Sequence, residues 1–161
     1  MIEKNFSFNY EEYDSIDELS AEDALLVNGA REATKLAYAP YSNFLVGAFA
    51  SLTSGEFVKG SNQENASYPV GICAERALLA STAQIFPNVP INTLAISYNN
   101  LNGSSGLPLC PCGMCRQAIN EFENRFNRPI RIILSGMEGK VIVIAQASQL
   151  LPLSFNRDSF F

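Results

Sequence analysis

The chain has 161 residues, a length typical of a single domain, and its 47% hydrophobic and 17% charged residues argue against a disordered polymer. Its net charge of −5 argues against binding along a nucleic acid backbone and favours a small molecule or a protein as the partner. The absence of histidine excludes Ser-His-Asp and Cys-His catalysis and every histidine-ligated metal site.

The sequence also predicts where the protein is located. The chain contains no run of 18 apolar residues, which a membrane-spanning helix would need. Residues 1–6 lack the pattern of a signal peptide, in which charged residues are followed by apolar ones. We therefore expect a cytoplasmic protein with no membrane partner. Thiols stay reduced in the cytosol, so clustered cysteines there indicate a metal site or catalysis rather than disulfides.

The N-terminal half predicts a helix followed by a β-hairpin. Ser20 and Asp23 have the spacing of a capping box. The apolar residues that follow repeat with the period of an amphipathic helix, to about residue 38. Residues 44–53 and 57–63 then have the composition of two strands, joined by a turn that contains a Ser-Gly pair.

The C-terminal half alternates helices and strands. The expected elements are a helix at 73–86, a strand at 91–98, a helix at 113–126, strands at 130–134 and 141–145 and a short helix at 148–151. This alternation predicts an α/β fold in which a sheet lies between helical layers. Residues 1–20 show no clear period, so we interpret them as an N-terminal extension that precedes one catalytic domain over residues 21–161.

Two segments of the chain place cysteine at the start of a predicted helix. Cys73 begins the first of these helices, and Cys112 and Cys115 lie at the start of the second. The free amides and the dipole of a helix N-terminus stabilise thiolates. Cysteines three residues apart also share one face of a helical turn, where both sulfurs can reach one ion. The pattern therefore favours zinc, one ion per subunit, held by these three sulfurs.

The number of ligands separates two kinds of zinc site. A structural zinc takes four protein ligands, whereas a catalytic zinc takes three and leaves a position for water. Cys110 could be the fourth ligand of a closed site, so a zinc-stabilised structural module stays open as an alternative. We favour the three-cysteine site, because a carboxylate follows Cys73 so closely, and we interpret Cys110 as a bystander.

Glu75 is the candidate catalytic residue. It lies two residues after Cys73, where its carboxylate could take a proton from the water at the metal and pass it to a ring nitrogen and a leaving amine. Three thiolates would leave the zinc site with a charge of −1, which weakens the pull on that water. We expect Arg76 to compensate this charge by donating hydrogen bonds to the thiolates.

These segments resemble the cytidine deaminase family. The similar stretches are Cys-Ala-Glu-Arg from residue 73, Pro-Cys-Gly-Met-Cys-Arg-Gln from 111, Tyr-Ala-Pro-Tyr-Ser from 38, Gly-Ser-Asn-Gln-Glu-Asn-Ala-Ser-Tyr from 60 and Leu-Leu-Pro-x-x-Phe from 150. Together they span about residues 22–156. The resemblance implies a zinc-dependent hydrolase that deaminates cytidine and deoxycytidine to uridine and deoxyuridine, with release of ammonia, in pyrimidine salvage.

The resemblance also implies a fold, an assembly and further site residues. The fold would be a three-layer α/β/α sandwich with a central mixed sheet of about five strands, and the assembly would be a homotetramer with shared active sites. Asn62 and Glu64 would hydrogen-bond the ribose, while Phe155 would stack on the base from a neighbouring subunit. The expected substrate-binding residues are Phe44, Asn62, Glu64, Ala66, Tyr68 and Phe155.

Two other deaminase functions stay open. A deaminase of a cytosine-bearing antibiotic such as blasticidin S would share the metal segments, although the pair of Asn62 and Glu64 favours a ribose. A deaminase that edits nucleic acids would need a basic surface along the strand, which the net charge of −5 argues against. We therefore expect a nucleoside as the partner and no nucleic acid.

Overall fold

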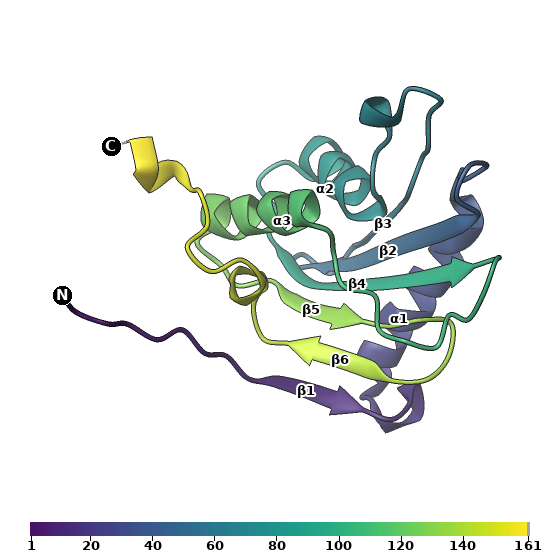
Figure 1. Ribbon diagram of the computed structural model, residues 1–161, viewed down its shortest axis with the longest axis horizontal. Coiled ribbons are helices and arrows are strands. Elements are labelled where there is room, and N and C mark those ends of the chain that lie inside the picture. Colours follow the sequence, from purple (N-terminus) through teal and green to yellow (C-terminus); the bar gives the residue numbers. More distant parts are fainter. Residues whose placement is uncertain (161) are drawn as a thin grey trace.

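The hairpin and the later strands assemble into one mixed sheet in the computed structural model, which describes residues 1–160 (Figure 1). Residue 161, the last of the expected catalytic domain, lies outside the described residues. Along the sheet the order is β1-β6-β5-β4-β2-β3, and the β4–β5 pair is parallel whereas the other pairs are antiparallel. The strands are β1 (Tyr10–Tyr13), β2 (Phe44–Leu52), β3 (Phe57–Ser61), β4 (Ile91–Asn100), β5 (Arg131–Leu134) and β6 (Val141–Ile144).

Helices cover both faces of this sheet (Figure 1). The helix α1 (Ala21–Ala33) packs on one face, and α2 (Ala74–Ile85) and α3 (Gly113–Phe126) pack on the other. Five 3-10 helices complete the elements: η1 (Ile16–Glu18), η2 (Thr34–Leu36), η3 (Tyr68–Val70), η4 (Ala147–Leu150) and η5 (Arg157–Phe160). None of the helices within residues 1–160 combines the length and the apolar character that crossing a membrane requires.

The core is divided by the sheet into two apolar clusters. One unites α1 with β4, β5 and β6, through residues such as Leu26, Ala95 and Ile133. The other unites α2 and α3 with the opposite side of the sheet, through residues such as Leu78 and Ile119. Successive strand residues point to opposite faces, so the apolar runs of β4 and β5 supply both clusters at once. The predicted three-layer α/β/α sandwich is confirmed.

The sheet has six strands rather than the expected five, because part of the N-terminal extension pairs with its edge. Strand β1 runs antiparallel to β6, with Tyr10 opposite Ile144 and Tyr13 opposite Val141. The Tyr13 ring then packs against the cluster under α1. The four residues of β1 do not alternate between apolar and polar side chains in a way that would have predicted a strand. Three of the four are exposed in the structure.

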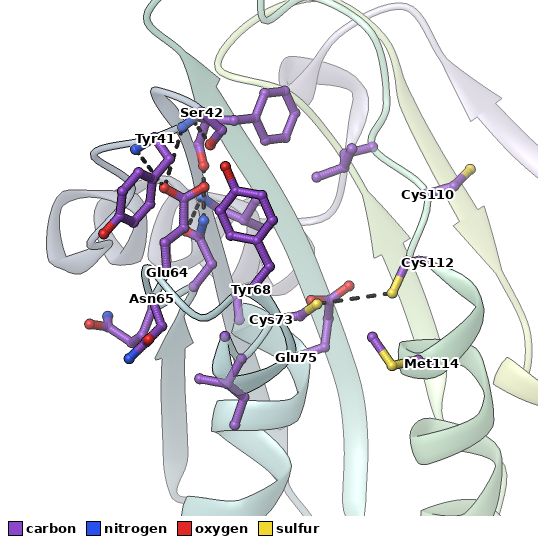
Figure 2. Close-up of a pocket in the computed structure, with 18 residues that line it drawn as sticks. Tyr41, Ser42, Glu64, Asn65, Tyr68, Cys73, Glu75, Cys110, Cys112 and Met114 are labelled. Carbon is purple, nitrogen blue, oxygen red and sulfur yellow. Dashed lines mark hydrogen bonds between the residues drawn. The ribbon is translucent and has the colours of Figure 1, made fainter.

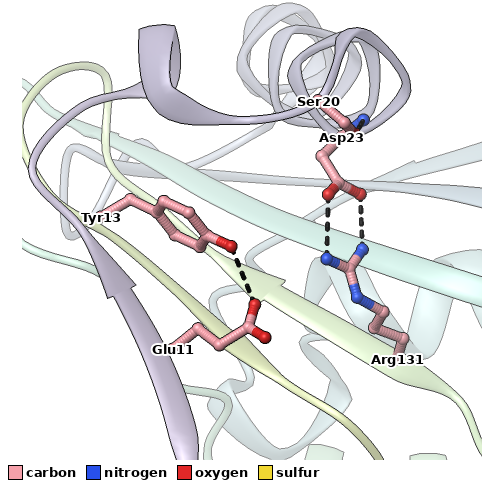
Figure 3. Close-up of polar contacts among 5 residues, drawn as sticks. All are labelled: Glu11, Tyr13, Ser20, Asp23 and Arg131. Carbon is pink, nitrogen blue, oxygen red and sulfur yellow. Dashed lines mark hydrogen bonds and ion pairs between the residues drawn. The ribbon is translucent and has the colours of Figure 1, made fainter.

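Polar contacts fix α1 at the same side of the molecule (Figure 3). The hydroxyl of Ser20 accepts a hydrogen bond from the Asp23 backbone N–H at 3.1 Å, as the capping box predicts. The Asp23 carboxylate receives two hydrogen bonds from Arg131, at 2.5 and 2.9 Å, and so joins α1 to β5. The predicted helix ends earlier than expected, at Ala33, and continues as η2 to Leu36.

Gly60 and Asn127 set how the helices of the other layer pack. A side chain at Gly60 would meet the Ala74 carbonyl oxygen at 2.4 Å, so only glycine lets α2 approach β3 this closely. Asn127 ends α3 in the left-handed conformation, with φ 47° and ψ 45°, which asparagine tolerates better than most residues. Gly60 therefore lets the first turn of α2 lie directly against β3, and Asn127 ends α3 before the chain turns toward β5.

Candidate active site

The first turns of α2 and α3 carry the three cysteines of the predicted metal site (Figure 2). Cys73 and Cys112 are the N-caps of these helices, both with extended backbone, and neither helix has a side-chain hydrogen bond at its cap. The amides of both first turns therefore lack the usual side-chain acceptor. These amides and the two helix dipoles favour negative charge on the sulfurs beside them.

The three sulfurs lie close enough to hold one ion. The Sγ atoms of Cys73, Cys112 and Cys115 all lie within 4.8 Å of one another. The Sγ of Cys112 lies 4.0 Å from that of Cys73 and 3.5 Å from that of Cys115. Two thiolates on a tetrahedral zinc with Zn–S bonds of about 2.3 Å would be about 3.8 Å apart. The donor set and its spacing both fit Zn²⁺, which confirms the predicted metal group.

Cys110 does not belong to this group. It is exposed, and Figure 2 shows its sulfur directed away from the sulfurs of Cys73 and Cys112. Within residues 1–160 the cluster of candidate ligands consists of the other three cysteines. Three protein ligands leave a fourth position of a tetrahedral ion open, as in catalytic rather than structural zinc sites.

The thiols of the cluster change one another's pKa. A hydrogen bond from the Cys115 thiol, opposed by burial, lowers the pKa of Cys73 to about 6. The pKa of Cys115 is raised, first because its proton is held by Cys73 and then because the site is buried. One thiolate thus forms at the expense of its neighbour, and a bound cation would allow all three to ionise.

Glu75 lies in the first turn of α2 beside the cysteines (Figure 2). Its residue is only 4% exposed, although it is among those that line the adjoining pocket. Burial raises the pKa of its carboxyl group, against a smaller opposing effect of hydrogen bonds from its own backbone and from Cys115. A carboxyl with a raised pKa, next to three sulfurs and a pocket, can both accept and return a proton.

Arg76 follows Glu75 in α2, close enough for its charge to affect Cys73. Its positive charge is among the effects that lower the pKa of Cys73. No hydrogen bond joins its guanidinium to a cysteine sulfur within the described part of the chain. The predicted hydrogen bonds from Arg76 to the thiolates are therefore not formed among the described residues, and compensation of the thiolate charge by Arg76 stays a prediction.

A pocket of about 620 Å³ opens onto Cys73, Glu75 and Cys112. This volume is within the usual range for small-molecule sites. Phe44 forms part of the wall, and its ring stacks on Tyr98 with 4.9 Å between the centroids. The remaining wall is mainly apolar, apart from a polar rim that contains Asn62 and Glu64.

The loop after β3 brings Asn62 and Glu64 to this rim. Backbone hydrogen bonds from Tyr38 to Asn62 and from Glu64 to Tyr38, at 3.0 and 2.7 Å, hold the loop on one side. On the other side Gln63 exchanges two backbone hydrogen bonds with Ile72, the residue before Cys73. The rim and the metal ligands are therefore parts of one hydrogen-bonded backbone unit.

Side-chain hydrogen bonds already orient both rim residues. The Asn62 amide donates to the Phe44 carbonyl oxygen at 2.9 Å and accepts from the Val46 N–H at 2.8 Å. The Glu64 carboxylate accepts from the backbone N–H groups of Tyr41 and Ser42 at 2.9 and 3.3 Å (Figure 2). A hydrogen bond from the Ser42 side chain is the main reason why the pKa of Glu64 is lowered.

The other expected binding residues lie farther out. Tyr68 lines the pocket but is 76% exposed, and its ring meets that of Tyr41 edge to face with 6.0 Å between the centroids. Ala66 is exposed and is not among the residues that line the pocket. Phe155 is 60% exposed and also lies outside the pocket of its own chain, where its ring contacts Phe160.

Several pocket residues were not among those singled out from the sequence. Tyr41 and Ser42 supply the N–H groups that hold Glu64, and the turn that carries them could have been found from the Pro-Tyr-Ser segment. Met114 lies between two ligands in the sequence and lines the pocket from the first turn of α3. Leu109 lines the pocket from the loop before α3, and its sequence surroundings give no indication of this.

Comparison with known proteins identifies the family. A family model described as the cytidine and deoxycytidylate deaminase zinc-binding region matches residues 20–127, a span that includes the three clustered cysteines and Glu75. The chain belongs to this deaminase family. The residues before the matched region are those of the N-terminal extension, up to residue 19.

Individual cytidine deaminases are similar over most of the chain. The enzyme of Halalkalibacterium halodurans is 32% identical over 134 residues, 83% of this chain and 94% of the relative. The enzyme of Mycobacterium tuberculosis is 36% identical over 110 residues, 66% of this chain and 78% of the relative. The crystal structure of cytidine deaminase from Burkholderia pseudomallei superposes with a TM-score of 0.72 at 35% identity, covering 85% of this chain and 100% of that one.

Proposed function

We propose that the protein is a zinc-dependent cytidine deaminase, which hydrolyses cytidine and deoxycytidine to uridine and deoxyuridine. The observation that carries this proposal is the position of Glu75, buried at the wall of a pocket beside three sulfurs spaced for one zinc ion. The similarity to proteins named cytidine deaminase supports the choice of substrate.

Cys73, Cys112 and Cys115 would hold one zinc ion per subunit. When bound, zinc is a Lewis acid that lowers the pKa of water and so makes it a nucleophile at neutral pH. The positive charge of Arg76 and the N-termini of α2 and α3 would offset the charge of the three thiolates. These positive charges and helix dipoles would stabilise the three thiolates and so help the site to retain the ion.

Glu75 would move the protons of the reaction. Its carboxylate takes a proton from the attacking water and delivers it to N3 of the cytosine ring, while the water oxygen bonds to C4. It then passes the second proton of the water to the amino group, which leaves as ammonia, and the oxygen remains as the C4 carbonyl of uracil. Burial, which raises the pKa of Glu75, suits a group that must be protonated midway at neutral pH.

The rim residues would bind the ribose. Because the pKa of Glu64 is lowered, its carboxylate stays ionised and is a strong acceptor for ribose hydroxyl groups. Asn62 keeps one N–H and one oxygen lone pair beyond the bonds that it already makes. The aromatic rings of Phe44 and Tyr68 would contact the nucleoside on either side, and Ala66 would act through the backbone of the same loop.

The charge of the pocket favours nucleosides over nucleotides. Among the described residues that line it there is no lysine or arginine, whereas Glu64 and Glu75 are both present. A phosphate group near these carboxylates would be repelled without a cation to offset it. The pocket therefore suits neutral nucleosides, and not nucleotides or a nucleic acid strand.

We also propose the wider setting of the enzyme. It would be a cytoplasmic enzyme of pyrimidine salvage, with residues 1–20 as an extension of a catalytic domain over residues 21–161. It would assemble as a homotetramer in which Phe155 stacks on the base in a neighbouring subunit. The exposure of Phe155 and its place outside the pocket of its own chain support this assembly.

A mixing experiment tests the shared site. Subunits with Glu75→Gln and subunits with Phe155→Ala would each be weakly active alone. In mixed tetramers, sites that combine an intact Glu75 with Phe155 from a neighbour should recover activity. If mixed tetramers form and show no recovery, Phe155 does not act across subunits.

The reaction itself is tested with the purified zinc-loaded protein. Cytidine should be converted stoichiometrically to uridine and ammonia, followed by loss of its ultraviolet absorbance and by an ammonia assay. Deoxycytidine should react, whereas cytidine monophosphate should react poorly. Blasticidin S is assayed in parallel, and turnover of it without turnover of cytidine would replace the proposal with the antibiotic-deaminase function.

A further inference from the structure

Four polar side chains of α3 bind a single segment of the C-terminal part of the chain, residues 147–155. Figure 1 shows the yellow-green and yellow chain of this segment passing beside α3. Arg116 donates to the Leu150 carbonyl oxygen, Gln117 to that of Phe155 and Asn120 to the Ser154 hydroxyl, at 3.1, 2.8 and 3.0 Å. We call this segment the C-terminal strap.

Glu123 fixes the start of the strap. Its carboxylate is only 6% exposed and accepts hydrogen bonds from the N–H groups of Ala147 and Ser148, both at 2.8 Å. It also accepts from the Ile130 N–H at 2.7 Å, just before β5. A buried carboxylate with three N–H donors is well satisfied, and breaking such a set is costly. The strap is therefore attached firmly at the end that precedes Leu150.

Arg116 joins the strap to the loop that carries a metal ligand. Its Nε donates to the Pro111 carbonyl oxygen at 2.9 Å, while one terminal nitrogen donates to Leu150. Pro111 is buried and immediately precedes Cys112. Because the guanidinium is planar and its N–H directions are fixed, two bonds from one group set the relative position of the two carbonyls.

Cys112 is the ligand that this support reaches. Cys115 is fully buried within α3, whereas Cys112 is exposed and stands at the cap, where the loop meets the helix. Its sulfur position follows from the orientation of the peptide between Pro111 and Cys112, which is the group that Arg116 binds. Groups that orient a ligand in this way commonly change metal affinity by about 10–100-fold.

We propose that Arg116 is a positioning residue for the metal centre, which transmits the anchoring of the C-terminal strap to the ligand Cys112. The inference rests on the zinc site of the proposed function. It predicts that zinc retention depends on both hydrogen bonds of the Arg116 guanidinium, the one to Pro111 and the one to Leu150. A lysine, which has the same positive charge, would not replace them.

The test measures zinc release from the full chain. Wild-type protein and the variants Arg116→Lys, Arg116→Ala and Gln117→Ala are loaded with zinc and mixed with an excess of the chromophoric chelator 4-(2-pyridylazo)resorcinol. Gln117→Ala is the matched control, because it also removes one hydrogen bond from α3 to the strap but does not touch the loop before Cys112. Cobalt-substituted samples add a spectrum of the ligand geometry.

Both Arg116 variants should release zinc about 10–100-fold faster than the wild type, with an altered cobalt spectrum, and Gln117→Ala should release it at close to the wild-type rate. If Arg116→Ala does not fold, Arg116→Lys decides the question. Release from Arg116→Lys at the Gln117→Ala rate would overturn the inference alone. A wild-type protein that binds no zinc would overturn both the inference and the proposed function.

Discussion

The two helical layers of the sandwich begin their helices in different ways. In the layer that only packs, α1 starts at Ser20, whose side chain accepts a hydrogen bond from Asp23. In the layer that carries the chemistry, α2 and α3 start at Cys73 and Cys112, without a side-chain hydrogen bond at either cap. The backbone amides that a serine side chain would accept hydrogen bonds from stay available to stabilise thiolates. These two helices therefore lack the stabilisation of a side-chain cap at the place where the metal would bind.

A carboxylate in the first turn of α1 and one in the first turn of α2 differ in the same way. Asp23 in α1 is paired with Arg131 by two hydrogen bonds, as Figure 3 shows. Glu75 in α2 is more deeply buried, and no ion pair reaches it within residues 1–160. An unpaired buried carboxylate is costly, and such costs gather where a group must change its protonation state. The contrast assigns a stabilising role to Asp23 and a reactive role to Glu75.

The largest effect should follow from Glu75→Gln. This substitution keeps the shape of the side chain but removes the proton carrier, so kcat should fall by about 10²–10⁴-fold. Cytidine turnover and zinc content are measured together, and zinc should stay bound. The matched change in the other layer, Asp23→Asn, should leave kcat near the wild-type value, and an equal loss in both variants would break the comparison.

The second effect concerns the metal. Cys112→Ser should cost zinc affinity by more than the 10–100-fold that is typical of a residue outside the ligand set, and activity should be lost with it. Cys110→Ser is the matched control, because its sulfur lies outside the cluster and its loss should leave zinc content unchanged. Zinc retention by Cys112→Ser together with zinc loss by Cys110→Ser would contradict the three-cysteine site.

Much of this contrast was predictable from the sequence. The capping box at Ser20, the helix starts at Cys73 and Cys112 and the alternation of helices and strands depend on local patterns of a few residues, and the structure confirms each of them. The three metal-binding cysteines could be predicted as well. They lie at two helix starts of a chain without histidine, so few other sets of metal ligands are possible.

The features that could not be predicted depend on contacts between distant segments. Strand β1 forms because the open edge of β6 supplies its hydrogen bonds. The sequence of residues 10–13 does not indicate that pairing. The bonds of Asn62 to β2 and of Arg116 to the Leu150 carbonyl oxygen join residues 16 to 34 positions apart. Composition and spacing do not indicate such bonds, because any polar side chain could make them with whichever backbone the fold brings near.

A smaller effect concerns the pH dependence of stability. Because burial raises the pKa of Glu75 in the folded chain above that of the unfolded chain, the folded state binds this proton more tightly. Stability should therefore fall as pH rises through the interval from the ordinary glutamate pKa to the raised one. In metal-free protein at neutral pH, Glu75→Gln should raise the free energy of unfolding by up to about 2 kcal/mol.

Denaturant unfolding of metal-free wild type and Glu75→Gln at several pH values measures this gain. It should vanish in acid, below the ordinary glutamate pKa, where the wild-type side chain is protonated in both states. A gain that is the same at every pH would mean that the benefit of the amide has nothing to do with the proton.

The smallest effect should come from Ser20→Ala in the packing layer. Loss of the cap leaves the Asp23 N–H without its acceptor and should lower the free energy of unfolding by about 1 kcal/mol. Zinc content and kcat should be unchanged, since α1 lies across the sheet from the metal site. If Ser20→Ala also weakened zinc binding, the two layers would be coupled through the sheet, and the separation of stability from reactivity would not hold.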